Sequence, residues 1–449
     1  MKVVVVGYGA AGMTAASYAA LTNRKAEIIA FEKRSYAVYH PCSLPDLISG
    51  IVKSPEHLKE PPPRLPRLKV YTSTVVKEIK RGEKKVVVQD LKSGKEWEED
   101  YDKLILATGS FPYVPRVIKI LNSDGVHVLK KVEDAEAILD LANKYKRAVV
   151  VGGSFIGIET AHALKKKGLK VTLIEYFPQV MPGKLNEQLA RVVEKALEDE
   201  GIVLKLGVGV KEISGEVGNK KIIAGDEEIS GDFVVMATGT RPDVELAKKA
   251  GLEIGESGGI KVNEKMQTSD PSIYAAGDNA EVINIVTGQP MLSLLGSTAV
   301  KMGRVAGINA AGGKAKFRGV VNVWIVNIES LRFGGAGITF DQAKKLGLNA
   351  VAVTVQVPEK LEIYPDAHEM TIRLIADKDS GRILGGQILG KEGVLCRLDV
   401  LATVLSRGMT AEELAELELA YTPSVCEIID PLHVAADALL KRLRRYKTI

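Results

Sequence analysis

Cysteine is scarce in this chain of 449 residues, which has only Cys42, Cys396 and Cys426, far apart in the sequence. Three cysteines so placed cannot form a disulfide framework, so we expect the fold to depend on its hydrophobic cores. We also expect no secretory leader, since the strand-like run Lys2 to Val6 passes straight into Gly7. Both features favour a reducing cytoplasm as the compartment.

An excess of charge of one sign and a long apolar run are absent as well. The 61 basic and 56 acidic residues are interspersed and leave a net charge of +5. This pattern predicts neither a nucleic acid nor a membrane as partner. Glycine or charge breaks every apolar run before the roughly 20 residues that span a bilayer. The length predicts about two to four domains.

Two stretches share the same internal order of strand, glycine-rich turn, alanine-rich helix, second strand and acidic residue. The first starts at Lys2 and ends at Glu32, and the second starts at Ala148 and ends at Glu175. Each is followed by a later strand that ends in Ala-Thr-Gly. The repeat predicts two βαβ units, and therefore an α/β protein with two Rossmann-like dinucleotide-binding domains.

Two other regions have a different texture. The proline-rich region from Ser54 to Pro66 predicts a surface loop, because proline disrupts both helix interiors and central strands. After about Lys316, alternating apolar segments are followed by the amphipathic stretch from Val394 to Leu405. This change predicts a third, C-terminal α+β domain.

The first glycine-rich turn, residues 7–12, has the spacing of a dinucleotide-binding turn. Its three glycines allow a tight turn, the approach of a pyrophosphate and close packing of helix on strand. Free N–H groups at the helix N-terminus then hold the phosphates. Glu32 stands where a carboxylate accepts hydrogen bonds from a ribose diol. The alternative is a glycine-rich turn that binds nothing.

The second turn, residues 152–157, is followed by Glu175 at the equivalent strand end. A carboxylate there repels a 2′-phosphate, so we expect NADH to be preferred over NADPH. Glu159 is a further candidate contact, although the helix dipole also favours a plain glutamate in this first turn. A third signal is the strand ending in Gly277-Asp278. Its aspartate can accept a hydrogen bond from a flavin ribityl chain, or simply hold a turn.

Taken together, these motifs resemble the FAD-dependent pyridine nucleotide-disulfide oxidoreductase superfamily over nearly the whole chain. The resemblance implies an FAD-binding domain over residues 1–112 and 243–317, an NAD(P)H-binding domain over 113–242, and a dimerisation domain over 318–449 that makes a homodimer. It also implies a set of cofactor contacts. They are Gly7, Gly9, Ala10, Ala11, Gly12, Glu32, Lys33, Ala107, Thr108, Gly109, Gly152, Gly153, Phe155, Ile156, Gly157, Glu159, Glu175, Gly239, Gly277, Asp278, Thr298 and Ala299.

The cysteine pattern resembles one branch of this superfamily. The glutathione reductase type carries two cysteines four residues apart, whereas this chain has only Cys42 in that region. It is therefore similar to the single-cysteine branch of coenzyme A disulfide reductases, NADH oxidases and peroxidases, and polysulfide reductases. That branch implies a redox-active Cys42, a substrate contact at Ser43, and Tyr364 and Tyr421 acting from the partner subunit.

The implied reaction takes hydride from NADH to FAD and then electrons through Cys42 to a small disulfide, persulfide or polysulfide. We expect the helix start near Pro45 and the flavin to lower the pKa of Cys42 below about 8.5. His40 is expected to be structural. Cys396 is expected in the core, and Cys426 either is buried or relays electrons from Cys42 of the other subunit.

Two departures bear on the choice within the branch. Ala10 stands where peroxidases and water-forming oxidases carry histidine, which disfavours peroxide as substrate. Residues 18–21 read Tyr-Ala-Ala-Leu, where coenzyme A enzymes carry basic residues, but Tyr364 and Tyr421 match those enzymes. Coenzyme A therefore stays an open partner. The rival functions are an NADH oxidase that reduces oxygen through a sulfenic acid at Cys42, and a non-catalytic flavoprotein sensor or scaffold. No metal site is predicted.

Overall fold

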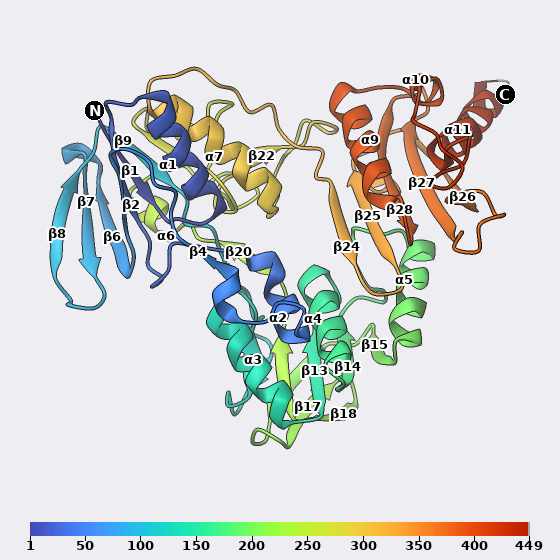
Figure 1. Cartoon of the computed structure of the whole chain (residues 1–449), viewed down its shortest axis with the longest axis horizontal. Helices are drawn as coiled ribbons and strands as arrows, with labels where there is room; N and C mark the ends of the chain where they lie inside the picture. Colours follow the sequence, from blue (N-terminus) through green and yellow to red (C-terminus); the bar gives the residue numbers. More distant parts are fainter. Residues whose placement is uncertain (448–449) are drawn as a thin grey trace.

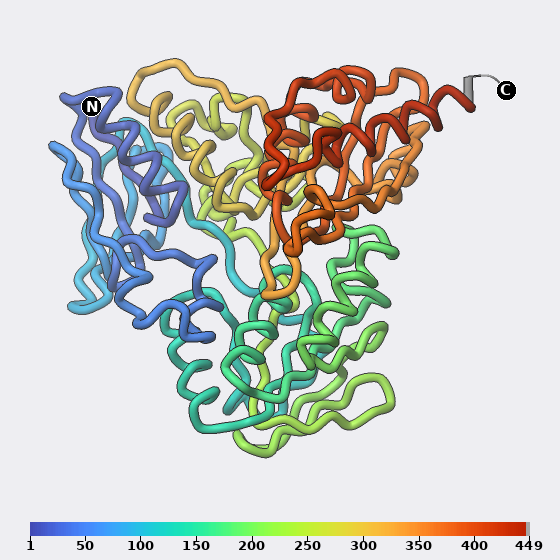
Figure 2. Tube along the Cα trace, turned by 45° about the vertical axis from the view of Figure 1, so that its right-hand side comes forward, coloured from blue at the N-terminus to red at the C-terminus, as the bar shows by residue number. Residues whose placement is uncertain are grey.

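The chain folds into three lobes, each built on its own five-stranded sheet (Figure 1). The computed structural model describes residues 1–447. The first lobe combines the N-terminal segment with a later one, shown in blue and yellow, and the second lobe is green. The C-terminal lobe is orange to red. The same grouping is visible from another side in Figure 2.

The first sheet is parallel, in the order β21-β9-β1-β2-β5. Its central strand is buried from Val3 to Val6, as expected for a parallel strand covered on both faces. Helices α1 (Ala10–Thr22) and α7 (Gly296–Ala310) pack beside it. The strands are β1 (Lys2–Val6), β2 (Glu27–Phe31), β5 (Leu68–Tyr71), β9 (Lys103–Leu106) and β21 (Ile273–Ala275), and the antiparallel sheet of β6 (Thr74–Lys80), β7 (Lys85–Asp90) and β8 (Glu96–Asp100) lies alongside.

The second sheet repeats the first, in the order β12-β19-β13-β14-β15 and with all strands parallel. The predicted pair of βαβ units is thereby confirmed. Its strands are β12 (Val126–Val128), β13 (Arg147–Val151), β14 (Lys170–Glu175), β15 (Ile202–Leu206) and β19 (Phe233–Met236), its helices are α3 (Val132–Lys144), α4 (Phe155–Lys166) and α5 (Glu187–Asp199), and a smaller sheet holds β11 (Lys119–Ile120), β16 (Val210–Ser214), β17 (Lys220–Ala224) and β18 (Glu227–Gly231).

The two Ala-Thr-Gly tripeptides lead directly into the connections between the first two lobes. Strands β10 (Ser110–Pro112) and β20 (Thr240–Pro242) follow them and pair antiparallel. Thr108 donates its hydroxyl to the Asp243 carbonyl at 2.6 Å, and Thr238 donates to the Tyr113 carbonyl at the same distance. The repeated threonines therefore bond reciprocally across the crossover and fix the two lobes to each other.

The C-terminal sheet is antiparallel, in the order β24-β25-β28-β27-β26, and helices cover it. The predicted α+β lobe is confirmed. Its elements are β24 (Trp324–Asn327), β25 (Arg332–Gly337), α8 (Phe340–Lys345), β26 (Ala350–Pro358), β27 (Glu369–Asp377), β28 (Ile383–Gly390), α9 (Val394–Arg407), α10 (Ala411–Ala415) and α11 (Pro431–Lys447).

Short elements complete the chain. The proline-rich region is mostly irregular, as predicted, but holds one 3₁₀ turn and a two-residue strand. These are the 3₁₀ turn Pro55–Leu58 and the strand β4 (Lys59–Glu60), which pairs with β3 (Val38–Tyr39). The other short elements of the chain are 3₁₀ turns Pro41–Ser43 and Arg81–Glu83, α2 (Leu44–Ser49), α6 (Glu245–Lys249), β22 (Val282–Ile283) and β23 (Pro290–Met291).

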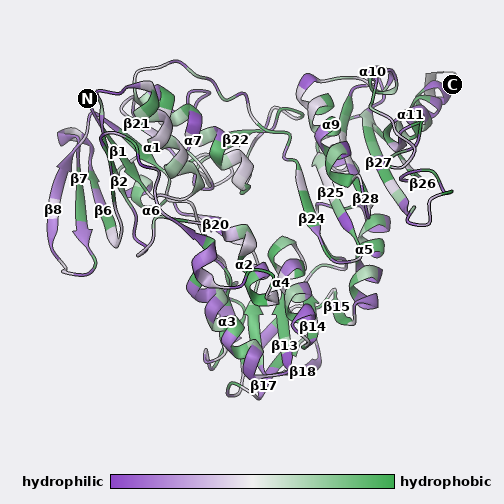
Figure 3. Cartoon of the chain, viewed as in Figure 1, coloured by the Kyte–Doolittle hydropathy of each residue, from purple (hydrophilic) through white to green (hydrophobic). Residues whose placement is uncertain are grey.

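Apolar residues gather in the sheets of all three lobes, while the outer strand β8 and the outer helices are largely polar (Figure 3). Within residues 1–447, no helix has both the length and the apolar character needed to cross a membrane.

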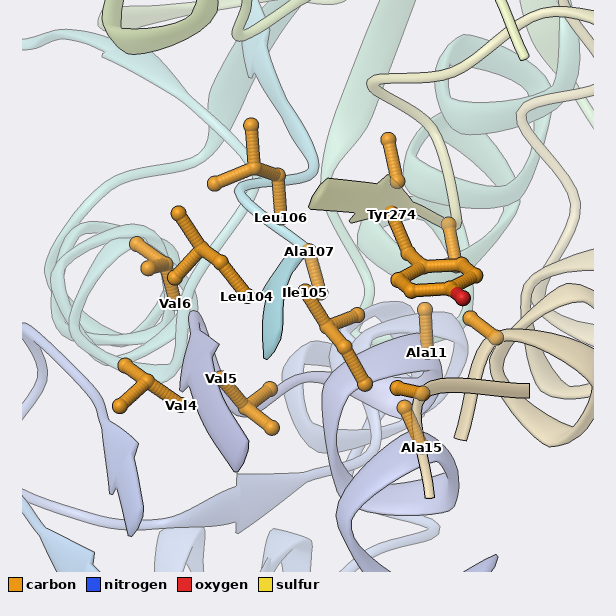
Figure 4. Packing of buried hydrophobic residues seen from close by; sticks show 14 of the residues in the cluster. Val4, Val5, Val6, Ala11, Ala15, Leu104, Ile105, Leu106, Ala107 and Tyr274 are labelled. Atoms are coloured by element: carbon orange, nitrogen blue, oxygen red, sulfur yellow. The ribbon is translucent and has the colours of Figure 1, made fainter. Parts of the chain in front are cut away.

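Helices α1 and α7 approach each other unusually closely. A side chain at Gly303 would overlap the carbonyl oxygen of Ala11, and one at Gly307 would overlap that of Ala15. Small residues on α1 face this contact and the buried ring of Tyr274, as Figure 4 shows for Ala11 and Ala15. The first turn of α1 is thereby held in place by the second segment of its lobe.

Replacing Gly307 by Ala should therefore push α7 away from α1 and lower the free energy of unfolding by about 1 to 3 kcal/mol. Denaturant unfolding of the purified protein measures the change. The control is Gly82→Ala, because a side chain at Gly82 meets no atom within 4 Å. Equal stability of the two variants would contradict the packing argument.

Candidate active site

The first glycine-rich turn leaves open space beside Gly9 at the start of α1. Gly9 is the N-cap, no side chain caps the helix, and its first turn holds no acidic residue. A side chain at Gly9 would meet no atom within 4 Å, whereas one at Gly12 would overlap the Gly7 carbonyl oxygen. Free N–H groups beside open space fit the pyrophosphate of FAD, since a helix N-terminus binds anions.

Three chain segments meet at this opening. Gly277 has a left-handed φ of 95°, and a side chain there would lie 2.9 Å from the Ala11 side chain and 3.9 Å from that of Ala299. Thr298, beside Ala299 in the first turn of α7, is buried. Its hydroxyl accepts a hydrogen bond from the Ser293 hydroxyl. The structure thus brings together Ala11, Gly277 and the start of α7, which are far apart in sequence.

Glu32 is buried, but its carboxylate already has partners. Oε1 accepts from the backbone N–H and Nε of Arg34 at 2.9 and 2.8 Å. Oε2 accepts from Nη2 of Arg34 at 2.7 Å and from the Tyr8 N–H at 2.8 Å. Burial alone would raise the pKa of Glu32, yet the hydrogen bonds and charge of Arg34 lower it. The carboxylate predicted to hold a ribose is therefore held first by Arg34, while the neighbouring Lys33 is exposed.

Glu175 occupies the equivalent position in the second crevice, but within residues 1–447 no lysine or arginine pairs with it. Its Oε2 accepts from the Gly153 N–H at 2.6 Å, and its Oε1 accepts from the Phe177 N–H at 2.9 Å. Each oxygen thus keeps one acceptor position for a ribose hydroxyl. Helix α4 starts beside it at Phe155, with no acidic residue in its first turn. The second crevice fits the dinucleotide of NAD(P)H.

Cys42 lies in a 3₁₀ turn, residues 41–43, immediately before α2. It is exposed. Its thiol lies within electrostatic reach of Glu159 on α4, of Asp278 at the Gly-Asp turn, and of Lys130. These groups come from both nucleotide-binding lobes. The structure therefore places Cys42 at the junction of the two predicted cofactor sites, with Ser43 next to it.

We predicted that the start of the helix near Pro45 lowers the pKa of Cys42. For the groups of the protein itself this prediction was wrong. Desolvation by the surrounding chain raises the pKa of the Cys42 thiol, and the negative charges of Glu159 and Asp278 raise it further. Only Lys130 opposes this effect. Helix α2 is too short, at six residues, for its N-terminus to overcome the other contributions.

Glu159 is the second titrating group of the site. Burial raises the pKa of Glu159 to about 7, and the charge of Asp46 on α2 adds to the rise. No hydrogen bond or ion pair within residues 1–447 holds its carboxyl group. A carboxyl group with this pKa exchanges a proton near neutral pH.

Lys130 was not recognised in the sequence. Its ammonium donates to the Ser110 hydroxyl at 2.8 Å and lies 3.8 Å from Asp278 Oδ2. Ser110 in turn donates to the same oxygen at 2.7 Å. Nothing in the local sequence marks Lys130, because strand β12 and the Gly-Asp turn meet only in the folded chain.

The other predicted residues lie outside this junction. His40 pairs with Glu60 at 2.9 Å, which fits the structural role expected for it. Tyr421 is exposed and Tyr364 half-buried, both in the C-terminal lobe. Cys426 is half-buried in the same lobe, and its relay to the other subunit stays a prediction.

The prediction of a core position for Cys396 was wrong. Cys396 is exposed and donates its thiol to the Gly393 carbonyl. The buried stripe of α9 includes Val394, Leu398 and Leu401, and Cys396 lies off that stripe. The helical period, rather than the apolar nature of a thiol, decides its exposure.

The basic residues beside Tyr18 of α1 come from α7 rather than from α1 itself. The Arg304 guanidinium lies 5.5 Å from the Tyr18 ring centroid, and Lys301 is exposed one turn earlier. Residues three apart on a helix lie on one face. Helix α7 therefore places positive charge beside Tyr18, in the part of α1 whose own sequence has no basic residue.

Comparison with known proteins shows similarity along the whole chain. Residues 1–303 match the pyridine nucleotide-disulphide oxidoreductase family, and residues 325–432 match its dimerisation domain. An NADH oxidase of Methanocaldococcus jannaschii is 39% identical over 449 residues, covering 99% of each chain. An NAD(P)H coenzyme A polysulfide/persulfide reductase of Pyrococcus horikoshii is 33% identical, covering 98% of each. The solved NAD-dependent persulfide reductase from A. fulgidus has a TM-score of 0.96 at 37% identity, covering 99% of this chain and 84% of that one.

Arg34→Gln should lower the free energy of unfolding by about 3 kcal/mol at pH 7, because it leaves the buried Glu32 carboxylate without its partner. The pKa of Glu32 is lower in the folded than in the unfolded protein. Its pairing with Arg34 therefore stabilises the fold at pH values above the unfolded-state pKa, and this stabilisation is lost in acid. The deficit should therefore shrink as the pH falls towards about 4. Urea unfolding at several pH values measures it, with Lys69→Gln at the exposed pair with Glu27 as control. A pH-independent deficit would contradict this account.

Glu159→Gln should remove a pH dependence of stability. The pKa of Glu159 is raised to about 7 in the fold, so the wild-type protein loses stability as the pH rises from about 4.5 to about 7. The melting temperature of the variant relative to wild type should increase across that window and level off above it. Glu228→Gln, at an exposed position of β18, is the control. A constant difference between variant and wild type would refute the assignment.

Proposed function

Because this chain belongs to the pyridine nucleotide-disulphide oxidoreductase family, whose members use FAD and NAD(P)H, we propose that it reduces small sulfur compounds with NADH. Bound FAD would carry electrons from NADH to Cys42, and Cys42 would reduce a low-molecular-weight persulfide, polysulfide or disulfide. The relatives named persulfide reductase support this substrate class. Family membership also removes the support for a non-catalytic sensor or scaffold.

The position of Cys42 carries the proposal. Its thiol lies in reach of Glu159 from the second crevice and of Asp278 from the first. One reactive sulfur between a dinucleotide site and a flavin site is the arrangement that a disulfide or persulfide reductase requires. Bound FAD would supply the two-electron carrier between NADH and this sulfur.

The chain's own groups account for the sulfur chemistry. The Cys42 thiolate attacks one sulfur of an R–S–S–R substrate, forms a mixed disulfide and releases RS⁻. Two electrons from NADH then cleave the Cys42–S–SR bond, so that Cys42 leaves as thiolate and the second RS⁻ departs. Lys130 favours the thiolate, because it is the cation that lowers the pKa of Cys42.

We assign Glu159 to proton supply for the departing thiolates. Its pKa of about 7 leaves it partly protonated near neutral pH, and it lies within electrostatic reach of the Cys42 thiol. A group acts as general acid most effectively when its pKa lies near the working pH. Tyr421 or Tyr364 of a partner subunit is the alternative donor.

NADH is the proposed electron donor rather than NADPH. Two backbone N–H groups hold Glu175, and no lysine or arginine of the described residues pairs with it. The exposed residues that follow are Tyr176 and Phe177. A carboxylate there accepts ribose hydroxyls and repels a 2′-phosphate.

A homodimer is the proposed assembly, formed through the dimerisation domain. That lobe exposes several large apolar side chains, which a partner subunit would cover. They are Ile363, Leu395, Tyr421, Val425, Ile428 and Ile429. We place the enzyme in a reducing cytoplasm, since all three cysteines are unpaired.

Coenzyme A is a proposed carrier of the sulfur substrate. Lys301 and Arg304 supply, from α7, the cations that the sequence of α1 lacks. Lysine and arginine are the side chains that bind phosphate groups. The relatives named coenzyme A polysulfide/persulfide reductase support this ligand.

Oxygen reduction is the second candidate, supported by the relative named NADH oxidase at 39% identity. Cys42 would then cycle through sulfenic acid. Ala10 in the first glycine-rich turn argues against peroxide as the substrate. Anaerobic NADH oxidation with and without added persulfide or disulfide separates the two functions, because an oxidase is silent without oxygen.

Cys42→Ser should lower kcat/KM for the persulfide or disulfide by at least about 1000-fold, because the nucleophile is lost. NADH oxidation by ferricyanide, which accepts electrons directly from the flavin, should be retained. The reaction is followed by NADH absorbance under nitrogen.

The matched control is Cys396→Ser, since Cys396 is also exposed but lies in the C-terminal lobe on α9. It should leave both activities unchanged. Full persulfide and disulfide reduction by the Cys42 variant would overturn the proposed function. Cys426→Ser tests the intersubunit relay in the same assay.

A further inference from the structure

A cavity of about 300 Å³ lies where the three lobes meet. The second lobe contributes Gly183 and Lys184, and the first lobe contributes the β22–β23 hairpin region, residues 284–291. The C-terminal lobe supplies residues of β24, β25, β28 and α8. Figure 1 shows β24 running down from the C-terminal lobe towards the second lobe. The cavity contains neither Cys42 nor any residue of the two glycine-rich turns, so it is separate from the proposed active site.

The charge of the lining has one sign. Lys184 and Lys345 are the ionisable side chains of this lining within the described residues, and neither aspartate nor glutamate is part of it. Lys184 is half-buried, whereas Lys345 is exposed on α8. A lysine that is largely removed from water is usually paired with a carboxylate. Here the lining supplies cations and no counter-charge.

The backbone that carries Lys184 is fixed by two amide side chains of the C-terminal lobe. Gln387 donates to the Lys184 carbonyl at 3.0 Å and accepts from the Asn186 N–H at 3.1 Å. Gln342 donates to the Gly183 carbonyl at 3.3 Å. These bonds hold Lys184 at the cavity across the boundary between two lobes.

Two polar groups of the lining have no partner among residues 1–447. Desolvation lowers the pKa of Lys184, and no carboxylate offsets that effect. Asn322 is only 8% exposed, yet its Oδ1 has no hydrogen-bond partner. A buried polar group without a partner costs free energy, so a chain tolerates such groups mainly where a ligand or water completes them.

Part of the remaining wall is apolar and includes one aromatic ring, while Thr and Gln side chains contribute to the rest. Trp324, Met291 and Ile338 line it, and the Trp324 ring lies 5.2 Å from that of Phe155, at the start of α4. A cavity with an apolar wall and a few convergent polar groups is the usual form of a small-molecule site.

We infer that this cavity binds a small organic anion, a phosphate or carboxylate group on a flat apolar body. Lys184 and Asn322 hold the anionic group, with Lys345 as a second cation, and the body packs against Trp324. The inference does not depend on the proposed sulfur chemistry, because the cavity and the Cys42 site share no residue.

The test uses the FAD-loaded protein and its own fluorescence. The chain has two tryptophans, so Trp97→Phe leaves Trp324 as the single indole reporter. Phenyl phosphate, benzoate, inorganic phosphate and uncharged benzyl alcohol are titrated at low ionic strength. We expect at least one organic anion to change the Trp324 fluorescence saturably, with half-saturation at about 1 mM or below. Inorganic phosphate should bind at least about ten times more weakly, and benzyl alcohol should not bind. The ranking of phenyl phosphate and benzoate assigns the anionic group.

Two substitutions locate the binding. Lys184→Met removes the charge and keeps the chain length, and Asn322→Asp adds a repelling charge at a left-handed φ of 52° that aspartate tolerates. Each should weaken organic-anion binding by at least about tenfold, since a hydrogen bond to a charged group contributes on that scale. Lys221→Met, at an exposed lysine of β17, should leave binding unchanged.

Lys184→Met should also raise the melting temperature, because it removes a desolvated charge, so its loss of binding cannot be ascribed to unfolding. The inference fails if neither organic anion gives a saturable signal, if inorganic phosphate or benzyl alcohol binds as tightly as they do, or if both cavity variants bind like the Lys221 control.

Discussion

The close approach of backbone to backbone at the two glycine-rich turns is the constraint on which the rest of the structure depends. A side chain at Gly12 would overlap the Gly7 carbonyl, and the same relation joins Gly157 to Gly152. With glycine at these positions, each helix starts directly at the end of its strand, so free N–H groups face open space. Both dinucleotide crevices, and therefore the position of Cys42 between them, follow from this contact.

The two crevices share a backbone design but differ in electrostatics. Arg34 saturates the Glu32 carboxylate, while Glu175 is held only by N–H groups and keeps free acceptor positions. A buried carboxylate with a bidentate arginine stabilises the loop that leads towards Cys42. A carboxylate without a cation remains available to a ligand that binds and leaves. The difference is consistent with the proposed assignment of a resident FAD to the first crevice and an exchanging NADH to the second.

The lobes are joined by apolar packing and by polar contacts. One buried apolar cluster contains Leu47 of α2, Ile158 of the second lobe and Trp324 of the C-terminal lobe. Thr108 and Thr238 bond reciprocally across the first boundary, and Gln387 and Gln342 clamp residues 183–186 across another. Such contacts fix the lobes in position but leave space between them. The active site and the proposed anion cavity both lie in such spaces, which is where ligand sites commonly form.

The sequence by itself determined the repeated βαβ units and the α+β C-terminal lobe, because glycine spacing and apolar periodicity act over a few residues. It was misleading on the pKa of Cys42 and on the exposure of Cys396, and it gave no sign of Arg34 as the partner of Glu32, of Lys130, or of the cavity at Lys184. Those features depend on groups brought together from distant segments, such as Ser110, Lys130 and Asp278. Burial and charge at a site are sums over such neighbours, so only the tertiary structure decided them.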